Sequence, residues 1–270
     1  MLELLEQLFR QVRSYAQSER YDRQQVYQES PKHTTMQFDR DAEDIIINGL
    51  IESQHGFEVV TEERPTFTTI PNPPYRIVID PIDGSQNMAR GLMTAGIALA
   101  VLPFGALAVP ENVQWALVGE LFSGTVYQAM QGNGAFRNGR RCHVSTVKHI
   151  KDSLVGLNLD GRDQQTLRTL LLEKPVFNGI RRTGSAAIDS VYVASGTYDA
   201  YIDVGDVVTG ESFLASLSIV LEAGGIVSDQ EGKALRPITN LTEGYSLVIA
   251  GTKELHSEIL TKITRPMMTR

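Results

Sequence analysis

The stretch Asp80-Pro81-Ile82-Asp83-Gly84-Ser85 places two carboxylates and a glycine directly after an apolar run. That run, Ile77–Ile79, is typical of a buried strand, and the proline is predicted to end the strand immediately after Asp80. Both acids then lie in a turn at the edge of a sheet, where carboxylate oxygens suit a hard cation such as Mg²⁺. Gly84 and Ser85 can open a short helix whose free backbone N–H groups bind an anion. The stretch predicts a cation site beside a phosphate site, although Asp-Pro and Asp-Gly pairs also occur in ordinary turns.

Further acidic residues occur upstream. Glu62 and Glu63 follow the strand-like run Phe57–Val60, which can bring a third carboxylate to the same corner. Asp39 is a candidate helix N-cap, because it precedes apolar residues at helical spacing: Ala42, Ile45, Ile46 and Leu50.

These motifs together resemble the inositol monophosphatase superfamily of Mg²⁺-dependent phosphatases, whose first signature is an Asp-Pro-Ile/Leu-Asp-Gly-Ser/Thr string. Other matching segments follow in the family's order along nearly the whole chain: Ser30-Pro31 to Asp39, Glu62-Glu63, Gly132–Phe136 with Asn138-Gly139, Gly184–Ala187, Asp199–Tyr201 and Glu222–Gly225. The resemblance implies an α+β or α/β fold, the five-layered αβαβα sandwich of the inositol monophosphatase and fructose-1,6-bisphosphatase type.

The resemblance also implies two or three Mg²⁺ ions per site. Glu62, Asp80 and the Ile82 carbonyl would hold one ion, and Asp80 and Asp83 would hold another, so that Asp80 bridges the two. Such ion pairs clamp the attacking and leaving oxygens and acidify a bound water, so no protein nucleophile is required.

The remaining implied roles concern the water and the substrate. Ser85, bonded to Asp39, would orient or deprotonate the water, with Glu62 beside it, and the N–H groups of Gly84 and Ser85 would bind phosphate. Ala186 and Asp203 would contact the substrate, although an acid in this run also fits the polar face of an alternating strand.

One departure from the family pattern concerns its second signature, a Trp-Asp pair whose Asp is a further metal ligand. Counting back from Glu222 without gaps places Glu211 at the Trp and Ser212 at the Asp. Three alternatives stay open: Glu211 substitutes as the ligand, which we favour; Asp206 does so through a shifted loop; or the second metal is weakened and Ser212 caps the helix.

The order of elements predicts two lobes. Residues 1–150 form an α+β lobe that carries the metal site, and residues 151–270 form an α/β lobe that contributes substrate recognition. In the first lobe, an amphipathic helix begins the chain, and the apolar segments 95–102 and 106–109 are predicted as two buried strands joined by a turn. In the second, we expect a strand at 154–157, helices at 164–172, 186–194 and 212–223, a strand at 246–250 and a terminal helix.

Composition narrows the class of protein. A formal charge of −7 argues against a nucleic-acid-binding surface, and one cysteine among 270 residues forms no internal disulfide, which favours the cytoplasm. The uncharged segment 91–110 is interrupted by glycine and proline, so we expect no membrane partner.

We therefore expect a Mg²⁺-dependent phosphomonoesterase for a small polyol or sugar phosphate, with inositol monophosphate as the leading candidate. Other family substrates are alternatives: fructose 1,6-bisphosphate, histidinol phosphate and 3′-phosphoadenosine 5′-phosphate. A phosphate-binding regulatory protein with impaired catalysis is the alternative of another class. The resemblance also implies lithium sensitivity and a homodimer.

Overall fold

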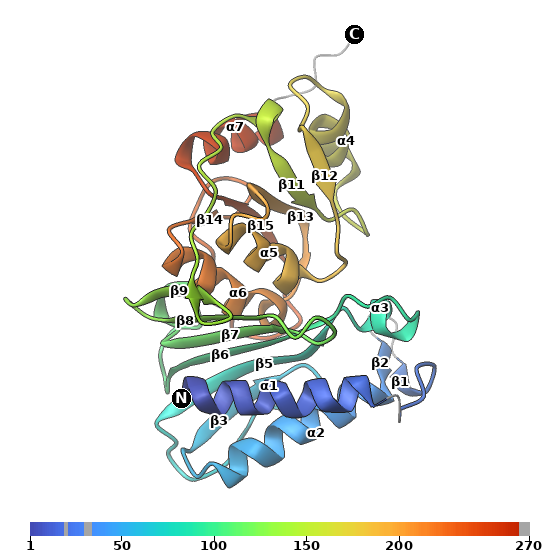
Figure 1. Cartoon of the computed structure of the whole chain (residues 1–270), viewed down its shortest axis with the longest axis vertical. Coiled ribbons are helices and arrows are strands. Elements are labelled where there is room, and N and C mark those ends of the chain that lie inside the picture. Colours follow the sequence, from blue (N-terminus) through green and yellow to red (C-terminus); the bar gives the residue numbers. More distant parts are fainter. Residues whose placement is uncertain (19–20, 30–33, 265–270) are drawn as a thin grey trace.

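The computed structural model describes residues 1–18, 21–29 and 34–264, so the Ser30-Pro31 match lies outside the described residues. Within them, the chain forms one large mixed sheet with the strand order β10-β9-β8-β7-β6-β5-β3-β4 (Figure 1). Its strands are β3 (Phe57–Thr61), β4 (Phe67–Thr68), β5 (Tyr75–Asp83), β6 (Gly96–Pro103), β7 (Trp115–Glu120), β8 (Val126–Met130), β9 (Gly134–Arg137) and β10 (Arg140–Arg141).

A smaller sheet, of order β12-β11-β13-β15-β14, follows in the second half of the chain. Strand β11 pairs in parallel with β12 and β13, whereas β15 runs antiparallel to both β13 and β14. These strands are β11 (Leu154–Leu157), β12 (Gly179–Arg181), β13 (Ala200–Val208), β14 (Ile226–Ser228) and β15 (Tyr245–Ala250). In a separate two-stranded sheet, β1 (Val26–Glu29) pairs antiparallel with β2 (Thr34–Met36).

Helices form the other three layers. Figure 1 shows α1 and α2 below the large sheet, α5 and α6 between the sheets, and α4 and α7 beyond the small sheet, which confirms the predicted αβαβα order. The helices are α1 (Leu2–Gln17), α2 (Gln37–Glu52), α3 (Ser85–Ala89), α4 (Gln164–Leu172), α5 (Ala186–Ala194), α6 (Gly210–Glu222) and α7 (Lys253–Thr264).

Alternating side chains divide each sheet between two cores. In β6, Ile97, Leu99 and Val101 pack against α1 and α2, whereas the intervening Ala98, Ala100 and Leu102 face α5 and α6. Small alanines on the second face allow the two interior helices to approach the sheet closely. Burial on both faces therefore explains why this strand is apolar throughout.

Three local predictions are wrong. Strand β5 does not end after Asp80 but continues through Pro81 to Asp83, with an irregular register between the two acids. A proline is tolerated there because the ladder is already broken. Residues 106–109 form no strand, since the chain turns at Gly105 and exposes 63% of Leu107. Asp39 is not the N-cap of α2: Met36 is, and Asp39 stands three residues later, where its Oδ2 accepts the Met36 N–H at 2.9 Å.

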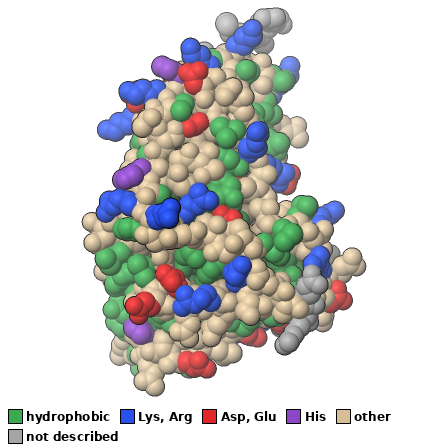
Figure 2. Space-filling view, in the orientation of Figure 1, with side chains coloured by type: hydrophobic (Ala, Val, Ile, Leu, Met, Phe, Trp, Pro, Cys, Tyr) green, Lys and Arg blue, Asp and Glu red, His purple; other side chains and the backbone are tan. Residues whose placement is uncertain are grey.

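The surface carries both signs of charge. Figure 2 shows acidic and basic side chains scattered over one face among hydrophobic and other side chains. In the described part of the chain, no helix is both long and apolar enough to cross a membrane.

Candidate metal and phosphate site

Two buried carboxylates lie at the end of β5. Asp80 is 3% exposed and Asp83 is 8% exposed. Burial raises the pKa of Asp80 well above its ordinary value, and the negative charges of Asp83, Glu62 and Glu211 raise it further. Burial likewise raises the pKa of Asp83 to about 6. Four acids thus act on one another across a small space, an arrangement that a bound cation would stabilise.

The start of α5 fixes Asp83. Its Oδ2 accepts hydrogen bonds from the Ser185 hydroxyl and from the Ala187 N–H, each at 2.6 Å. Ala186 lies between these two donors in sequence, so the structure places it beside the acidic corner. The second half of the chain therefore holds one of the two acids in place.

The start of α6 approaches Asp80. The Ser212 hydroxyl donates to Asp80 Oδ2 at 3.0 Å. Ser212 is the residue that the ungapped count places at the Asp of the family's second signature, so a hydrogen-bond donor to Asp80 stands where that signature has a carboxylate. Glu211 is 2% exposed and accepts a hydrogen bond from the Thr209 hydroxyl. Asp206 lies elsewhere, since its Oδ1 accepts from the Ser246 hydroxyl at 2.8 Å and its side chain is exposed. Of the two acids considered, Glu211 is the one whose charge acts on Asp80, and Ser212 does not cap α6, because the N-cap is Thr209.

A hydroxyl–carboxylate pair lies beside the two acids. Ser85 Oγ is 2.7 Å from Asp39 Oδ1 and 2.8 Å from the Ile82 carbonyl oxygen, so its one proton can be donated to either acceptor, of which Asp39 is the nearer. Gly84 precedes it with φ of 103°, and a Cβ there would meet the Thr94 carbonyl at 3.0 Å. Only glycine therefore fits the turn that brings Ser85 to Asp39.

Glu62 and Glu63 follow β3 and interact with different neighbours. Glu62 is exposed, and its charge acts on Asp80. Glu63 instead accepts a hydrogen bond from the Thr35 hydroxyl at 2.5 Å. Of this pair, Glu62 is accordingly the acid whose charge acts on the Asp80–Asp83 corner.

Asp203 is fully buried, so it does not lie on an exposed polar face of its strand. Arg162 donates to both of its oxygens, from Nε at 2.6 Å and from Nη2 at 2.8 Å. The side chains of Asn158, at 2.9 Å, and Tyr201, at 3.1 Å, donate as well. Asp203 is near enough to Asp83 for its charge to raise the pKa of that acid.

Arg162 is a residue of this region that sequence reasoning missed. Its partner Asp203 stands 41 positions away, and no local pattern marks the pair. Asn87 was missed for the same reason: its side-chain amide donates to the Thr94 and Thr183 carbonyls, both at 2.8 Å, and so ties α3 to the segment before α5.

The donor set fits Mg²⁺. Among the residues that the structure describes, no three His, Cys, Asp or Glu side chains are placed to hold one metal ion between them. Mg²⁺ does not need such a cage, because it keeps several waters and is bound by one or two carboxylates together with substrate phosphate. Asp80, Asp83, Glu62, Glu211 and the Ile82 carbonyl supply only oxygen atoms, as a hard cation requires.

Comparison with known proteins gives a consistent result. Residues 2–267 match the model of the inositol monophosphatase family. A fructose-1,6-bisphosphatase/inositol-1-monophosphatase of Methanothermobacter thermautotrophicus is 33% identical over 186 residues, which cover 68% of this chain and 65% of that protein. The Nus factor SuhB of Pseudomonas aeruginosa is 30% identical over 255 residues, or 91% of this chain and 88% of that protein. The crystal structure of the extragenic suppressor protein suhB from Bartonella henselae has a TM-score of 0.81 at 26% identity, and covers 99% of this chain and 98% of that chain.

Proposed function

Because the chain belongs to the inositol monophosphatase family, we propose that it is a Mg²⁺-dependent phosphomonoesterase for a small polyol or sugar phosphate. The family consists of phosphatases that are generally metal-dependent. The observation that carries the proposal is the buried Asp80–Asp83 pair with the Ser85–Asp39 pair beside it. Residues 1–150 would supply most of the metal site, and residues 151–270 the substrate contacts and Glu211.

In this proposal, Asp80, Asp83, Glu62, Glu211 and the Ile82 carbonyl hold the metal. When bound, Mg²⁺ would offset the charge of the substrate phosphate and make a water more acidic. The chain's acids are then stabilised in their ionised form, because the cation opposes their mutual repulsion.

Ser85 and Asp39 act on the attacking water. Ser85 donates to Asp39 at 2.7 Å, which leaves the lone pairs of its hydroxyl oxygen to accept a hydrogen bond from the attacking water. That hydrogen bond turns an oxygen lone pair of the water toward phosphorus. Asp39, 2% exposed, can take up the proton of the Ser85 hydroxyl while Ser85 takes one from the water, as the new P–O bond forms and the ester P–O bond breaks. The departing ester oxygen would take a proton from solvent and leave as the alcohol. The N–H groups of Gly84 and Ser85 would bind the phosphate oxygens.

Inositol monophosphate is the substrate that we propose first, with fructose 1,6-bisphosphate second. The relative from Methanothermobacter thermautotrophicus carries both activities in its name, which supports testing both esters. Ala186 is proposed to contact the substrate through its backbone. Asp203 is proposed to act together with Arg162, because its oxygens already accept hydrogen bonds from that guanidinium.

A panel of phosphate esters tests the proposal. Purified protein is treated with a chelator, supplied again with Mg²⁺ and assayed for phosphate release from inositol 1-phosphate, fructose 1,6-bisphosphate, histidinol phosphate and 3′-phosphoadenosine 5′-phosphate. We expect release that requires Mg²⁺ and that Li⁺ inhibits. Absence of release from every ester would contradict the proposal.

A second candidate is a phosphate-binding regulatory protein with impaired catalysis. Ser212 in place of a metal-ligating acid favours it, as does the similarity to a protein named as a Nus factor. Binding of inorganic phosphate in the presence of Mg²⁺, measured by calorimetry without turnover of any ester, would select this candidate. We further propose a homodimer, which light scattering at micromolar concentration tests against a monomer of 29.8 kDa.

A further inference from the structure

Glu43 is a fully buried carboxylate on α2 that lies outside the proposed metal site. Its Oε1 accepts the Thr61 hydroxyl at 2.7 Å, and its Oε2 accepts Arg64 Nε at 2.5 Å. Thr61 and Arg64 stand on either side of Glu62 in the chain. One carboxylate therefore holds both ends of the short segment that presents Glu62.

Two arginines reinforce this attachment. Arg40 Nη1 is 3.1 Å from Glu43 Oε2 and donates to the Glu63 carbonyl at 2.6 Å. Arg64 Nη2 donates to Asp44 Oδ1 at 2.5 Å. The segment is thus bound to α2 through side chains before and after Glu62 and through the main chain of Glu63. A buried charge is stable only when it is paired in this way.

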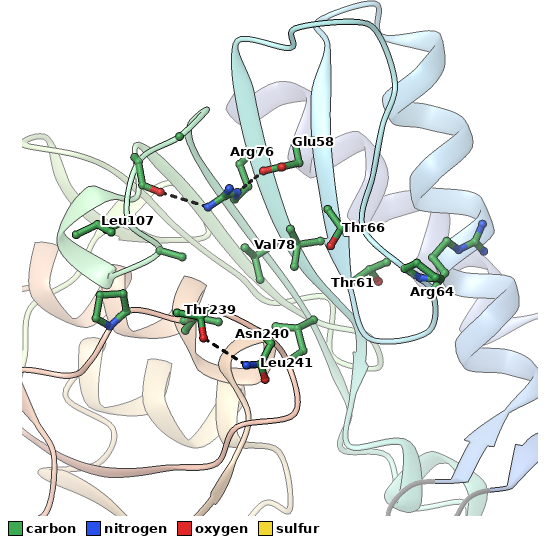
Figure 3. Close-up of a pocket in the computed structure, with 17 residues that line it drawn as sticks. Glu58, Thr61, Arg64, Thr66, Arg76, Val78, Leu107, Thr239, Asn240 and Leu241 are labelled. Atoms are coloured by element: carbon green, nitrogen blue, oxygen red, sulfur yellow. Dashed lines mark hydrogen bonds and ion pairs between the residues drawn. The ribbon is translucent and has the colours of Figure 1, made fainter.

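The opposite side of the segment borders a cavity of about 590 Å³. Thr61, Arg64 and Thr66 line it from the segment, and Leu107 and Thr239 line it from facing loops (Figure 3). Figure 3 shows the guanidinium of Arg64 directed away from the cavity, toward α2. Because the segment borders this cavity on one side, we infer that its position depends on the polar network on the other side.

Helix α2 also carries Asp39, the partner of Ser85. Asp39 and Glu43 are four residues apart and lie on the same face of this helix, and both are buried. One rigid element thus fixes the hydroxyl–carboxylate pair through Asp39 and the Glu62 segment through Glu43.

Resting on the function proposed above, we propose that Glu43 is a positioning residue that sets the Mg²⁺ affinity of the site by holding the segment that carries Glu62. It touches neither metal nor substrate. Residues that orient metal ligands in this way typically change metal affinity by about 10- to 100-fold when they are replaced.

The test compares three variants. Glu43→Gln keeps the shape and removes the charge, and Thr61→Val removes one hydroxyl donor and keeps the shape. Glu58→Gln is the matched control. Glu58 lies on β3, the strand that ends at Thr61, and it pairs with Arg76 at another part of the same cavity (Figure 3). Each variant is measured for the Mg²⁺ concentration at half-maximal activity, for kcat at saturating Mg²⁺ and for amide hydrogen exchange of residues 61–66.

We expect Glu43→Gln to raise the Mg²⁺ requirement at least about tenfold and Thr61→Val to raise it by a smaller factor. In both, kcat should recover largely at saturating Mg²⁺, and residues 61–66 should exchange faster. The control should match wild type in all three measurements. Unchanged Mg²⁺ requirement and unchanged exchange in Thr61→Val and Glu43→Gln, or equal changes in the control, would overturn the inference.

Failure of the proposed function gives a different result. A wild type that hydrolyses no ester contradicts the function alone, and the inference is then decided by hydrogen exchange of residues 61–66 and by calorimetric titration with Mg²⁺. If Glu43→Gln does not fold, Thr61→Val provides the same comparison.

Discussion

The buried carboxylate of Asp203 and the buried pair Asp80 and Asp83 lie near each other, and they differ in what balances their charge. Asp203 receives a two-point contact from Arg162 and further hydrogen bonds from Asn158 and Tyr201. Asp80 and Asp83 receive hydrogen bonds from serine hydroxyls and a backbone N–H, and other acids surround Asp80. Hydrogen bonds from these neutral donors lower the pKa of Asp80 and Asp83, but they only partly offset burial and the like charges nearby, so both pKa values stay raised. We therefore expect Asp203, whose charge is balanced within the protein, to stabilise the fold, and we expect a cation to balance Asp80 and Asp83 if the proposed function is right.

The largest expected effect is a loss of activity when Asp80 or Asp83 is replaced. Asp80→Asn and Asp83→Asn should each lower kcat by about 100-fold or more, because each removes charge that holds the metal. The same changes should leave the free energy of unfolding of the metal-free protein unchanged or higher, since they relieve repulsion. Phosphate release and urea unfolding measure the two quantities. Full activity in either variant would remove these acids from the site.

Replacing Asp203 should instead lower the stability of the fold. Asp203→Asn leaves Arg162, whose side chain is 9% exposed, without a carboxylate partner and should cost about 3 kcal/mol of unfolding free energy. Asp160→Asn is the control: Asp160 pairs with Arg182 but its side chain is 70% exposed, so the cost should stay below about 1 kcal/mol. Urea unfolding measures both, and equal costs would contradict the distinction between the two groups.

The pH dependence of stability should separate the metal-free and Mg²⁺-bound protein. Burial raises the pKa of Asp83 from 3.8 to about 6, so the folded state binds more protons than the unfolded state in this range. Without metal, the stability that Asp83 contributes is therefore greatest at low pH and is lost as the pH rises through the folded-state pKa of about 6. With Mg²⁺ the loss should diminish, because the cation stabilises the ionised form. Melting temperatures across this range, with and without Mg²⁺, measure the effect, and identical curves would argue against a cation at Asp83.

The last prediction concerns the start of α6, where the size of the effect depends on which residue supplies the charge. If Glu211 supplies the second-metal charge, Glu211→Gln should abolish activity and Ser212→Asp should change little. If the position is vacant, Ser212→Asp should instead lower the Mg²⁺ requirement, by about tenfold. Mg²⁺ titrations of both variants, after folding is checked by circular dichroism, distinguish these cases. No change in either would mean that the second ion is held by another group or is not needed.

Local pattern predicted much of the fold. The strand Leu154–Leu157 and the helices Gln164–Leu172 and Ala186–Ala194 have the predicted bounds. Strong local signals explain this agreement, since Asp163 and Ser185 cap the two helices through their side chains. The course of β5 through Pro81 was not predictable in this way, because it depends on pairing with β6.

For the site, the resemblance to the family identified the acidic residues but not the residues that surround them. The Ser85–Asp39 contact and the charges around Asp80 lie as the resemblance implied, and the roles of these residues stay predictions. The pairing of Asp203 with Arg162 depends on long-range contacts that no local pattern encodes. Glu43 did leave a signal in the sequence: it is an acid on the apolar face of α2, between Ala42 and Ile46, and such an acid needs a buried partner.

The most direct test of the central claim, that the Asp80–Asp83 corner binds a cation used for phosphate ester hydrolysis, is a Mg²⁺ titration of chelator-treated wild-type protein with inositol 1-phosphate and fructose 1,6-bisphosphate. The account predicts no phosphate release without Mg²⁺ and release that rises to saturation as Mg²⁺ is added. Release that is independent of Mg²⁺, or its absence at every Mg²⁺ concentration with both esters, would contradict it.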